Sequence, residues 1–282
     1  PKWYFHPFAW VEQMKRVFVN NADHGDIHDP ILNPQVRGWY NKGTNLNKKS
    51  KIKGWNPYAS MLINSQTTNE DVKKYGKSQR STGEHSGLDF YAPVGTPIYA
   101  CVDGIIEYHR MYGAKAGFLT ILKGEYKGEV YSFQYMHLME IENDKFRFYN
   151  NYKNSKNVTN DGWLNYKDLE SELKDPLVGE VYKISYDQKN KTLLIDKNTI
   201  DINLAKSIYK GKKVKKGDVI GYTGSTGNSY QGKDKNHLHF GIKKSNGVRI
   251  DPFELLKEYI NFDSSGEETH KKQDGITPSS EW

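Results

Sequence analysis

Short apolar runs separated by turn residues recur along the chain from about residue 87 onward. They are TPIYACV (96–102), GIIEYHR (104–110), FLTILKG (118–124) and EVYSFQYMHL (129–138). Runs of this length, rich in aromatic and β-branched residues and bounded by glycines, are typical of antiparallel strands joined by tight turns. The Asp103–Gly104 pair between the first two runs predicts a hairpin that makes them neighbours in one sheet.

Strand-like runs return before the C-terminus, in VKKGDVIGYTGSTGNS (214–229) and HLHFGIKK (237–244). Between the two groups of strands, residues 139–210 are charged and rich in asparagine. We therefore expect a mainly β fold with minor α content, built on an antiparallel sheet. The charged stretch of about seventy residues is predicted to be an insertion flanked by sheet on both sides.

Two elements are predicted inside this insertion. The segment WLNYKDLESEL (163–173) indicates a short helix, with Asn160 or Asp161 as its N-cap. The segment GEVYKISYDQKNKTLLIDKNTI (179–200) indicates a β-hairpin with a polar turn at 188–191.

The two ends of the chain carry different patterns. Apolar residues at three- and four-residue spacing predict a short amphipathic helix over 6–19. The polar residues 263–282 have the composition of a disordered tail. The predicted divisions are an N-terminal extension (1–29), a main domain (30–138 and 211–262), the insertion (139–210) and the tail (263–282).

Composition limits the kind of site that the chain can carry. The net charge of +7, from 41 Lys and Arg against 34 Asp and Glu, favours polyanionic partners such as cell-wall polymers or nucleic acid. The basic residues are scattered and the aromatic residues lie on core-like strands, so we expect no nucleic-acid-binding stripe. No apolar run is long enough to span a bilayer. The single cysteine, Cys101, lies in an apolar run, so it predicts a buried thiol and leaves histidine and carboxylate as the ligands of any metal site.

Two short motifs carry the candidate chemistry. The first is His85-Ser-Gly-Leu-Asp89 and the second is His237-Leu-His239. Side chains two apart on a strand point to the same face, so His237 and His239 can both reach into one site while Leu238 packs behind the sheet. A catalytic zinc site needs three protein ligands and one open position. His85, Asp89 and one histidine of the second motif supply that number.

For the other histidines, packing or surface roles are favoured. His24 and His28 have the spacing that binds zinc on a helix, but Gly25 and Pro30 disfavour a helix there. The remaining ones, in loops, at the termini or near a strand end, are His6, His109 and His270.

Three blocks of the chain resemble the lysostaphin/LytM-type metallopeptidases, peptidase family M23. HSGLDFYAPVGTPIYACVDGII (85–106) is similar to that family's H-x-G-x-D block, and VYSFQYMHL (130–138) is similar to its Y-x-H-L strand. VKKGDVIGYTGSTGNS, HLHFGI and DPFELL (251–256) resemble its last block, and the three blocks occur in family order.

The resemblance implies roles for five residues. His85, Asp89 and His239 match the ligands of one zinc ion per chain. His137 and His237 match the two non-ligand histidines, of which one would act as a general base and the other would stabilise the oxyanion. The resemblance leaves open which histidine does which. It also implies an antiparallel β-sheet groove of the LytM/lysostaphin type, bordered by the glycine-rich loop GYTGSTGNS (221–229).

The chain departs from the family pattern in two places. The stretch GWNPYASMLINSQ (54–66) lacks the arginine that family members carry before the first ligand, which puts the groove wall in doubt. The insertion directly follows the strand that presents His137, so we expect it to overhang the site, as a substrate-selecting wall or as an autoinhibitory lid.

The expected activity is zinc-dependent hydrolysis of peptide bonds in peptidoglycan stem peptides or cross-links. An alternative is a catalytically inactive relative that binds and activates a cell-wall amidase, although such relatives lose ligands that are all present here. The N-terminal segment is faintly similar to entry sequences of peptidoglycan-attacking toxins delivered by secretion systems. Such a toxin would act as a monomer in the periplasm or outside the cell, with an immunity or inhibitor protein as a partner. The chain begins at Pro1 without a signal-peptide pattern, which leaves the export route open.

Overall fold

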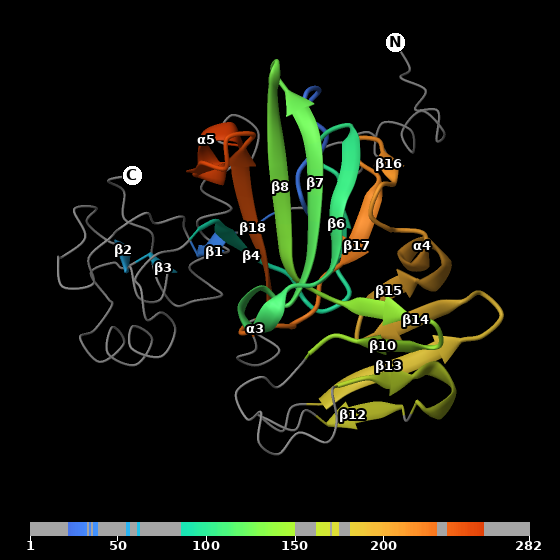
Figure 1. Cartoon of the computed structure of the whole chain (residues 1–282). Coiled ribbons are helices and arrows are strands. Elements are labelled where there is room, and N and C mark those ends of the chain that lie inside the picture. The colour runs from blue at the N-terminus through green and yellow to red at the C-terminus, as the bar shows by residue number, and fades with distance from the viewer. Residues whose placement is uncertain are drawn as a thin grey trace, which may run out of the picture.

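The structure is a computed structural model that describes residues 22–32, 34, 36–38, 55–56, 61–62, 86–149, 162–169, 171–174, 181–229 and 236–256. These residues form mostly antiparallel strands with a few short helices (Figure 1). The predicted fold class, mainly β with minor α content, is confirmed. The helix expected over 6–19 and the tail 263–282 lie outside the described residues.

The largest sheet has eight strands, and its central members come from distant parts of the sequence. Its order is β1 (Val36–Gly38), β4 (Leu88–Tyr91), β18 (His237–Lys244), β8 (Glu129–Leu138), β7 (Phe118–Tyr126), β6 (Gly104–Met111) and β16 (Lys213–Val214), and β19 (Arg249–Ile250) pairs with β18. All these pairs are antiparallel. Strand β18 therefore lies between β4 and β8, which brings Asp89, the His237-Leu238-His239 motif and the Y-x-H-L strand together.

One face of this sheet is packed with aromatic side chains. The ring of Phe240 on β18 lies 5.1 Å from that of Tyr135, 6.2 Å from that of Phe90 and 6.4 Å from that of Phe133. Rings at these separations attract one another beyond the apolar area that they bury. Tyr135 also donates a hydrogen bond of 3.1 Å to the sulfur of Cys101, which is fully buried as predicted. Burial raises the pKa of the Cys101 thiol, so it is not a nucleophile at neutral pH.

The predicted hairpin of 96–102 with 104–110 is wrong. Strand β5 (Pro97–Tyr99) instead pairs with β17 (Val219–Tyr222), while β6 pairs with β7. Asp103 lies at a corner between the two sheets, where its carboxylate accepts hydrogen bonds from Lys216 N at 2.8 Å and Lys215 Nζ at 2.7 Å. Long-range pairing thus overrides the local turn signal.

The described residues of the 139–210 stretch form two further sheets. One contains β9 (Glu140–Glu142), β10 (Lys145–Arg147) and β11 (Leu164–Asn165), and the other contains β12 (Glu172–Lys174), β13 (Val181–Asp187), β14 (Thr192–Ile195) and β15 (Asn198–Asp201). The predicted hairpin is confirmed by the pairing of β13 with β14. The helix predicted over 163–173 is wrong. Strands β11 and β12 frame a single 3-10 turn (Tyr166–Asp168), in which Asn165 accepts a hydrogen bond from Lys167 N at 2.9 Å.

These two sheets share a second hydrophobic core with the main domain. Val94, which follows β4, and Tyr222, on β17, contribute to it from the main domain. The members from within the stretch are Met139, Phe146, Phe148, Tyr149, Tyr166, Tyr182, Ile184, Leu193, Ile195, Ile200 and Ile202. The stretch is consequently packed against the main domain through buried apolar side chains.

The other elements are small. They are the helices α3 (Gly113–Ala116), α4 (Ile202–Lys206) and α5 (Pro252–Leu256), and the paired strands β2 (Trp55–Asn56) and β3 (Met61–Leu62). None of the helices in the described part of the chain has the length and apolar character that crossing a membrane requires.

Candidate active site

Four buried side chains gather at one end of the central strands. In the register of the sheet, His239 on β18 lies opposite Asp89 on β4 and opposite Met136 on β8, the neighbour of His137. The residue two before His239 on the same strand is His237. Each of these four residues, Asp89, His137, His237 and His239, exposes between 5% and 7% of its surface. The strand alternation predicted for His237 and His239 holds, since Leu238 and Phe240 between and beyond them belong to the main core.

The four side chains form one cluster. His239 Nδ1 lies 2.8 Å from Asp89 Oδ1, and His237 Nε2 lies 3.8 Å from the same oxygen. The ring of His137 lies 5.0 Å from that of His237 and 5.9 Å from that of His239. The fifth predicted residue, His85, lies outside the described residues.

His137 owes its position to an irregularity in strand β8. Phe118 pairs with Leu138 and Thr120 with Tyr135, so two residues of β8 lie opposite one residue of β7. His137 has a φ of 64°, in the left-handed region that side chains other than glycine seldom adopt. A bulge of this kind bends the strand and re-aims a side chain.

A backbone carbonyl fixes the tautomer of His137. Its Nδ1 lies 2.9 Å from Thr226 O. A carbonyl can only accept, so Nδ1 carries the proton and Nε2 of the neutral ring keeps its lone pair. Burial, followed by the nearby His237 and His239, lowers the pKa of His137 well below its ordinary value, so the ring is neutral near pH 7.

Residues 223–229 form a tightly packed loop behind His137. Thr226 Oγ1 accepts a hydrogen bond from Phe118 N and donates one to Leu138 O, both at 2.8 Å. Gly224 N donates to His137 O at 2.9 Å. Sequence reasoning expected this loop only to border a groove and missed Thr226. Thr226 contacts His137 through its backbone carbonyl, which any residue type could supply, so the residue itself gives no sequence signal. The signal is limited to glycines that let the loop approach the strand, such as Gly117, where a Cβ would lie 2.4 Å from atoms of Thr226.

Gly87 explains the spacing of the first motif. A Cβ at this position would lie 2.2 Å from Phe240 O and 2.9 Å from His239 Nε2. The chain between positions 85 and 89 therefore runs against β18, where a side chain has no room.

The donor set suits a zinc ion. Two donors bound to a tetrahedral zinc at about 2.0–2.1 Å lie roughly 3.3 Å apart, and Asp89 Oδ1 and His239 Nδ1 are 2.8 Å apart. A small adjustment would therefore let both atoms bind one ion. Among the described residues, which omit His85, no group of three His, Cys, Asp or Glu side chains is placed to hold a metal. A third ligand for such an ion would therefore lie outside the described residues.

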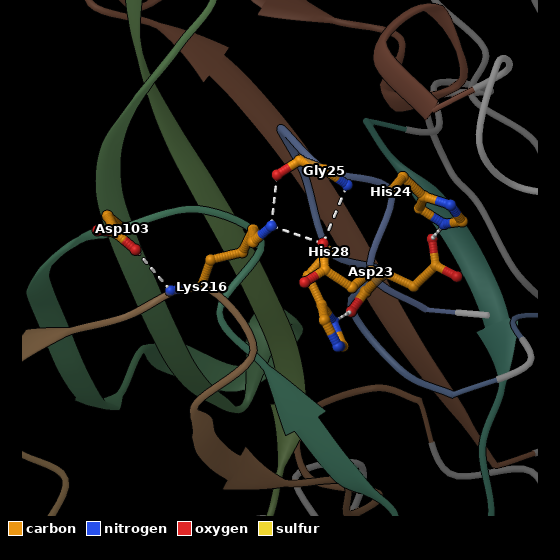
Figure 2. Close-up of polar contacts among 7 residues, drawn as sticks. Asp23, His24, Gly25, His28, Asp103 and Lys216 are labelled. Carbon is orange, nitrogen blue, oxygen red and sulfur yellow. Dashed lines mark hydrogen bonds and ion pairs between the residues drawn. The ribbon is translucent and has the colours of Figure 1, made fainter. Parts of the chain in front are cut away.

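The other described histidines lie elsewhere. Residues 22–32 are not helical, as predicted, and His24 Nε2 binds Asp29 Oδ1 at 2.9 Å. The same segment is tied to the main domain by Lys216, which binds the carboxylate of Asp23 and the carbonyl of Gly25 (Figure 2). His109 packs edge-on against Phe118, and its Nδ1 lies 2.8 Å from Thr120 Oγ1.

One family model matches part of the chain. Residues 161–252, about a third of the chain, match the model of Peptidase family M23. The matched stretch includes His237 and His239, whereas Asp89 and His137 precede it.

One curated protein and several solved structures are similar to parts of the chain. The chain is 28% identical over 75 residues to the peptidoglycan DD-endopeptidase ShyA of Vibrio cholerae, which is 27% of this chain and 16% of that protein. The catalytic domain of lysostaphin from Staphylococcus simulans is 22% identical with a TM-score of 0.34, over 63% of this chain and 82% of that domain. A zinc-containing peptidase from Vibrio cholerae is 18% identical with a TM-score of 0.31, over 76% of this chain and 39% of that chain. The family match and the ShyA similarity confirm the resemblance to peptidase family M23.

Proposed function

We propose that this relative of the M23 peptidases is a zinc-dependent endopeptidase that hydrolyses peptide bonds in peptidoglycan stem peptides or cross-links. The observation that carries the proposal is the buried cluster of Asp89, His137, His237 and His239 on three adjacent strands. Three imidazoles and a carboxylate withdrawn from solvent are costly to assemble for stability alone, and such clusters are typical of catalytic sites.

His85, Asp89 and His239 would hold the metal. Bound zinc would lower the pKa of a water molecule and polarise the scissile carbonyl. Asp89 supports this assignment because its Oδ1 lies near both His239 and His237 and supplies the negative charge of the site.

His137 is the better candidate for the general base. Its Nδ1–H donates to Thr226 O, so its Nε2 can accept a proton from the attacking water and later return it to the leaving amine. A ring that is neutral at neutral pH is already in the form that accepts a proton. His237, 5.0 Å from it between ring centres, would then donate to the developing oxyanion.

The substrate and the place of action follow from the proposed activity. The relative ShyA is named as a peptidoglycan endopeptidase, and the net charge of +7 suits an anionic wall. The protein would thus act in the periplasm or outside the cell. A role as a delivered antibacterial toxin, restrained by an immunity protein, is the corresponding hypothesis for its biological use.

Digestion of purified sacculi tests the proposal. The zinc-loaded protein should release soluble muropeptides with new peptide termini, and mass spectrometry of these products would identify the bond that is cut. Intact sacculi combined with stimulation of a purified cell-wall amidase would favour the alternative, an inactive regulator on the same fold.

A further inference from the structure

The insertion touches the chain directly before His237. Tyr182, on strand β13, accepts a hydrogen bond of 3.2 Å from the side-chain amide of Asn236. Both residues are buried, with exposed fractions of 1% and 3%. Asn236 is joined by one peptide bond to His237, and its carbonyl accepts a hydrogen bond from Ala92 N at 3.2 Å.

Asn236 directly precedes strand β18 (His237–Lys244), and its side-chain amide points to the insertion, where it meets Tyr182. The amide oxygen of Asn236 has no hydrogen-bond partner within the described ranges. The bond that the amide nitrogen donates to Tyr182 therefore orients the buried amide. Loss of that contact would leave a buried N–H group unsatisfied directly beside His237.

A second contact reaches the support of His137. Ser225 N donates a hydrogen bond to Phe148 O, and Tyr149 and Ser225 form a parallel bridge. The insertion therefore contacts two residues next to the site. Asn236 directly precedes His237, and Ser225 directly precedes Thr226, whose carbonyl binds His137.

Further contacts show that the insertion is fixed to the main domain. Asn198 donates a hydrogen bond to Val94 O at 2.8 Å, and Tyr222 accepts one from Asp201 N at 3.1 Å. A movable lid would have to break these bonds and expose the shared hydrophobic core. The geometry thus favours a fixed support over the lid considered from the sequence.

We propose that Tyr182 is a positioning residue which, through Asn236, holds His237 in its working orientation, so that the insertion braces the active site. This inference rests on the proposed function, since it assigns His237 a role in hydrolysis. The rate of the catalytic step depends steeply on the position of the catalytic groups, so a small displacement of His237 should slow turnover without weakening substrate binding.

Tyr182→Phe removes the hydroxyl and leaves the ring in the core. With soluble cross-linked muropeptides as substrate, we expect kcat to fall about three- to tenfold, the loss of one buried hydrogen bond, while KM is unchanged. Tyr186→Phe is the matched control, because it makes the same change on the same strand where the ring stacks on Tyr166. It should leave kcat unchanged.

Asn236→Ala and the double variant complete the test. Both single changes break the same hydrogen bond, so the double variant should be no slower than the slower single variant. A folded Tyr182→Phe protein with unchanged kcat, or losses that multiply in the double variant, would overturn the proposal. If Tyr182→Phe does not fold, Asn236→Ala alone decides between a fall in kcat and no effect.

A nuclear magnetic resonance measurement separates this inference from the proposed function. The ring nitrogen resonances of His237 should shift in Tyr182→Phe and not in Tyr186→Phe. The shift is expected whether or not the protein hydrolyses peptidoglycan. Absence of hydrolysis would overturn the proposed function but not the contact between Tyr182, Asn236 and His237. Unchanged His237 resonances in Tyr182→Phe would overturn the positioning role.

Discussion

The Nδ1 atom of His137 lies 2.9 Å from the carbonyl oxygen of Thr226, although 88 residues separate the two in the chain. The bond forms because a bulge turns His137 out of the regular strand and a glycine-rich loop packs behind it. It leaves Nε2 as the basic atom of a buried, neutral imidazole. The proposed division of labour between His137 and His237 depends on this contact.

Replacing His137 separates its role from metal binding. His137→Gln keeps a side chain of similar reach but removes the proton acceptor, so kcat on muropeptides should fall by about 10²- to 10⁴-fold. The zinc content, measured by mass spectrometry of the purified protein, should remain one ion per chain. Loss of zinc together with activity would instead make His137 a ligand.

Replacing His239 should affect the metal first. His239→Ala removes one of three predicted ligands, and we expect zinc affinity to fall by more than the roughly 10- to 100-fold that loss of a ligand's hydrogen-bonding partner costs. Competition with a chromogenic chelator measures this affinity. His109→Gln is the control, because His109 lies against Phe118 on another part of the sheet. A His239→Ala variant with wild-type activity would refute the site assignment.

Gly87 offers a test of the packing behind the first motif. Its Cβ would meet backbone atoms of Phe240, which cannot rotate away. Gly87→Ala should therefore destabilise the protein by about 1–3 kcal/mol and lower zinc affinity, because the chain carrying positions 85 and 89 must move. Urea unfolding gives the free energy of unfolding, and an unchanged midpoint with unchanged zinc affinity would contradict the account.

His109 should make stability depend on pH. Burial lowers the pKa of His109 to about 4 in the folded protein. The unfolded chain, with an ordinary histidine pKa near 6.5, binds more protons between these values, so stability falls as the pH drops from about 6.5 to 4. The full effect is on the order of 3 kcal/mol.

The difference in unfolding free energy between the wild type and His109→Gln isolates this group. As the pH falls from about 6.5 to 4, the variant should gain stability relative to the wild type by on the order of 3 kcal/mol. A constant difference from pH 7 to pH 4 would show that His109 titrates normally.

Much of the candidate site could be predicted from the sequence, because its determinants are local. The alternation of HLHFGIKK defines which face of β18 holds the histidines, and the observed strand has the predicted bounds. The need for glycine at position 87, by contrast, comes from the close approach of this segment to the distant strand β18 and appears only in the structure.

Other features depend on contacts between distant segments, and the sequence predictions for them were absent or wrong. Strand β5 pairs with the distant strand β17 rather than with its neighbour β6, which pairs with β7, and the local turn signal at Asp103–Gly104 does not encode either pairing. The bulge at His137 and the contact of Tyr182 with Asn236 leave no pattern in the sequence around them. The expected helix over 163–173 failed because its apolar residues are used in strand pairing and in the second core.

Removal and return of the metal tests the central claim most directly. The protein is stripped with a chelator, dialysed, and assayed on purified sacculi with increasing amounts of zinc. The account predicts no hydrolysis by the stripped protein and full recovery at one zinc ion per chain. Full hydrolysis by the stripped protein, or none by the protein loaded with one zinc ion, would contradict it.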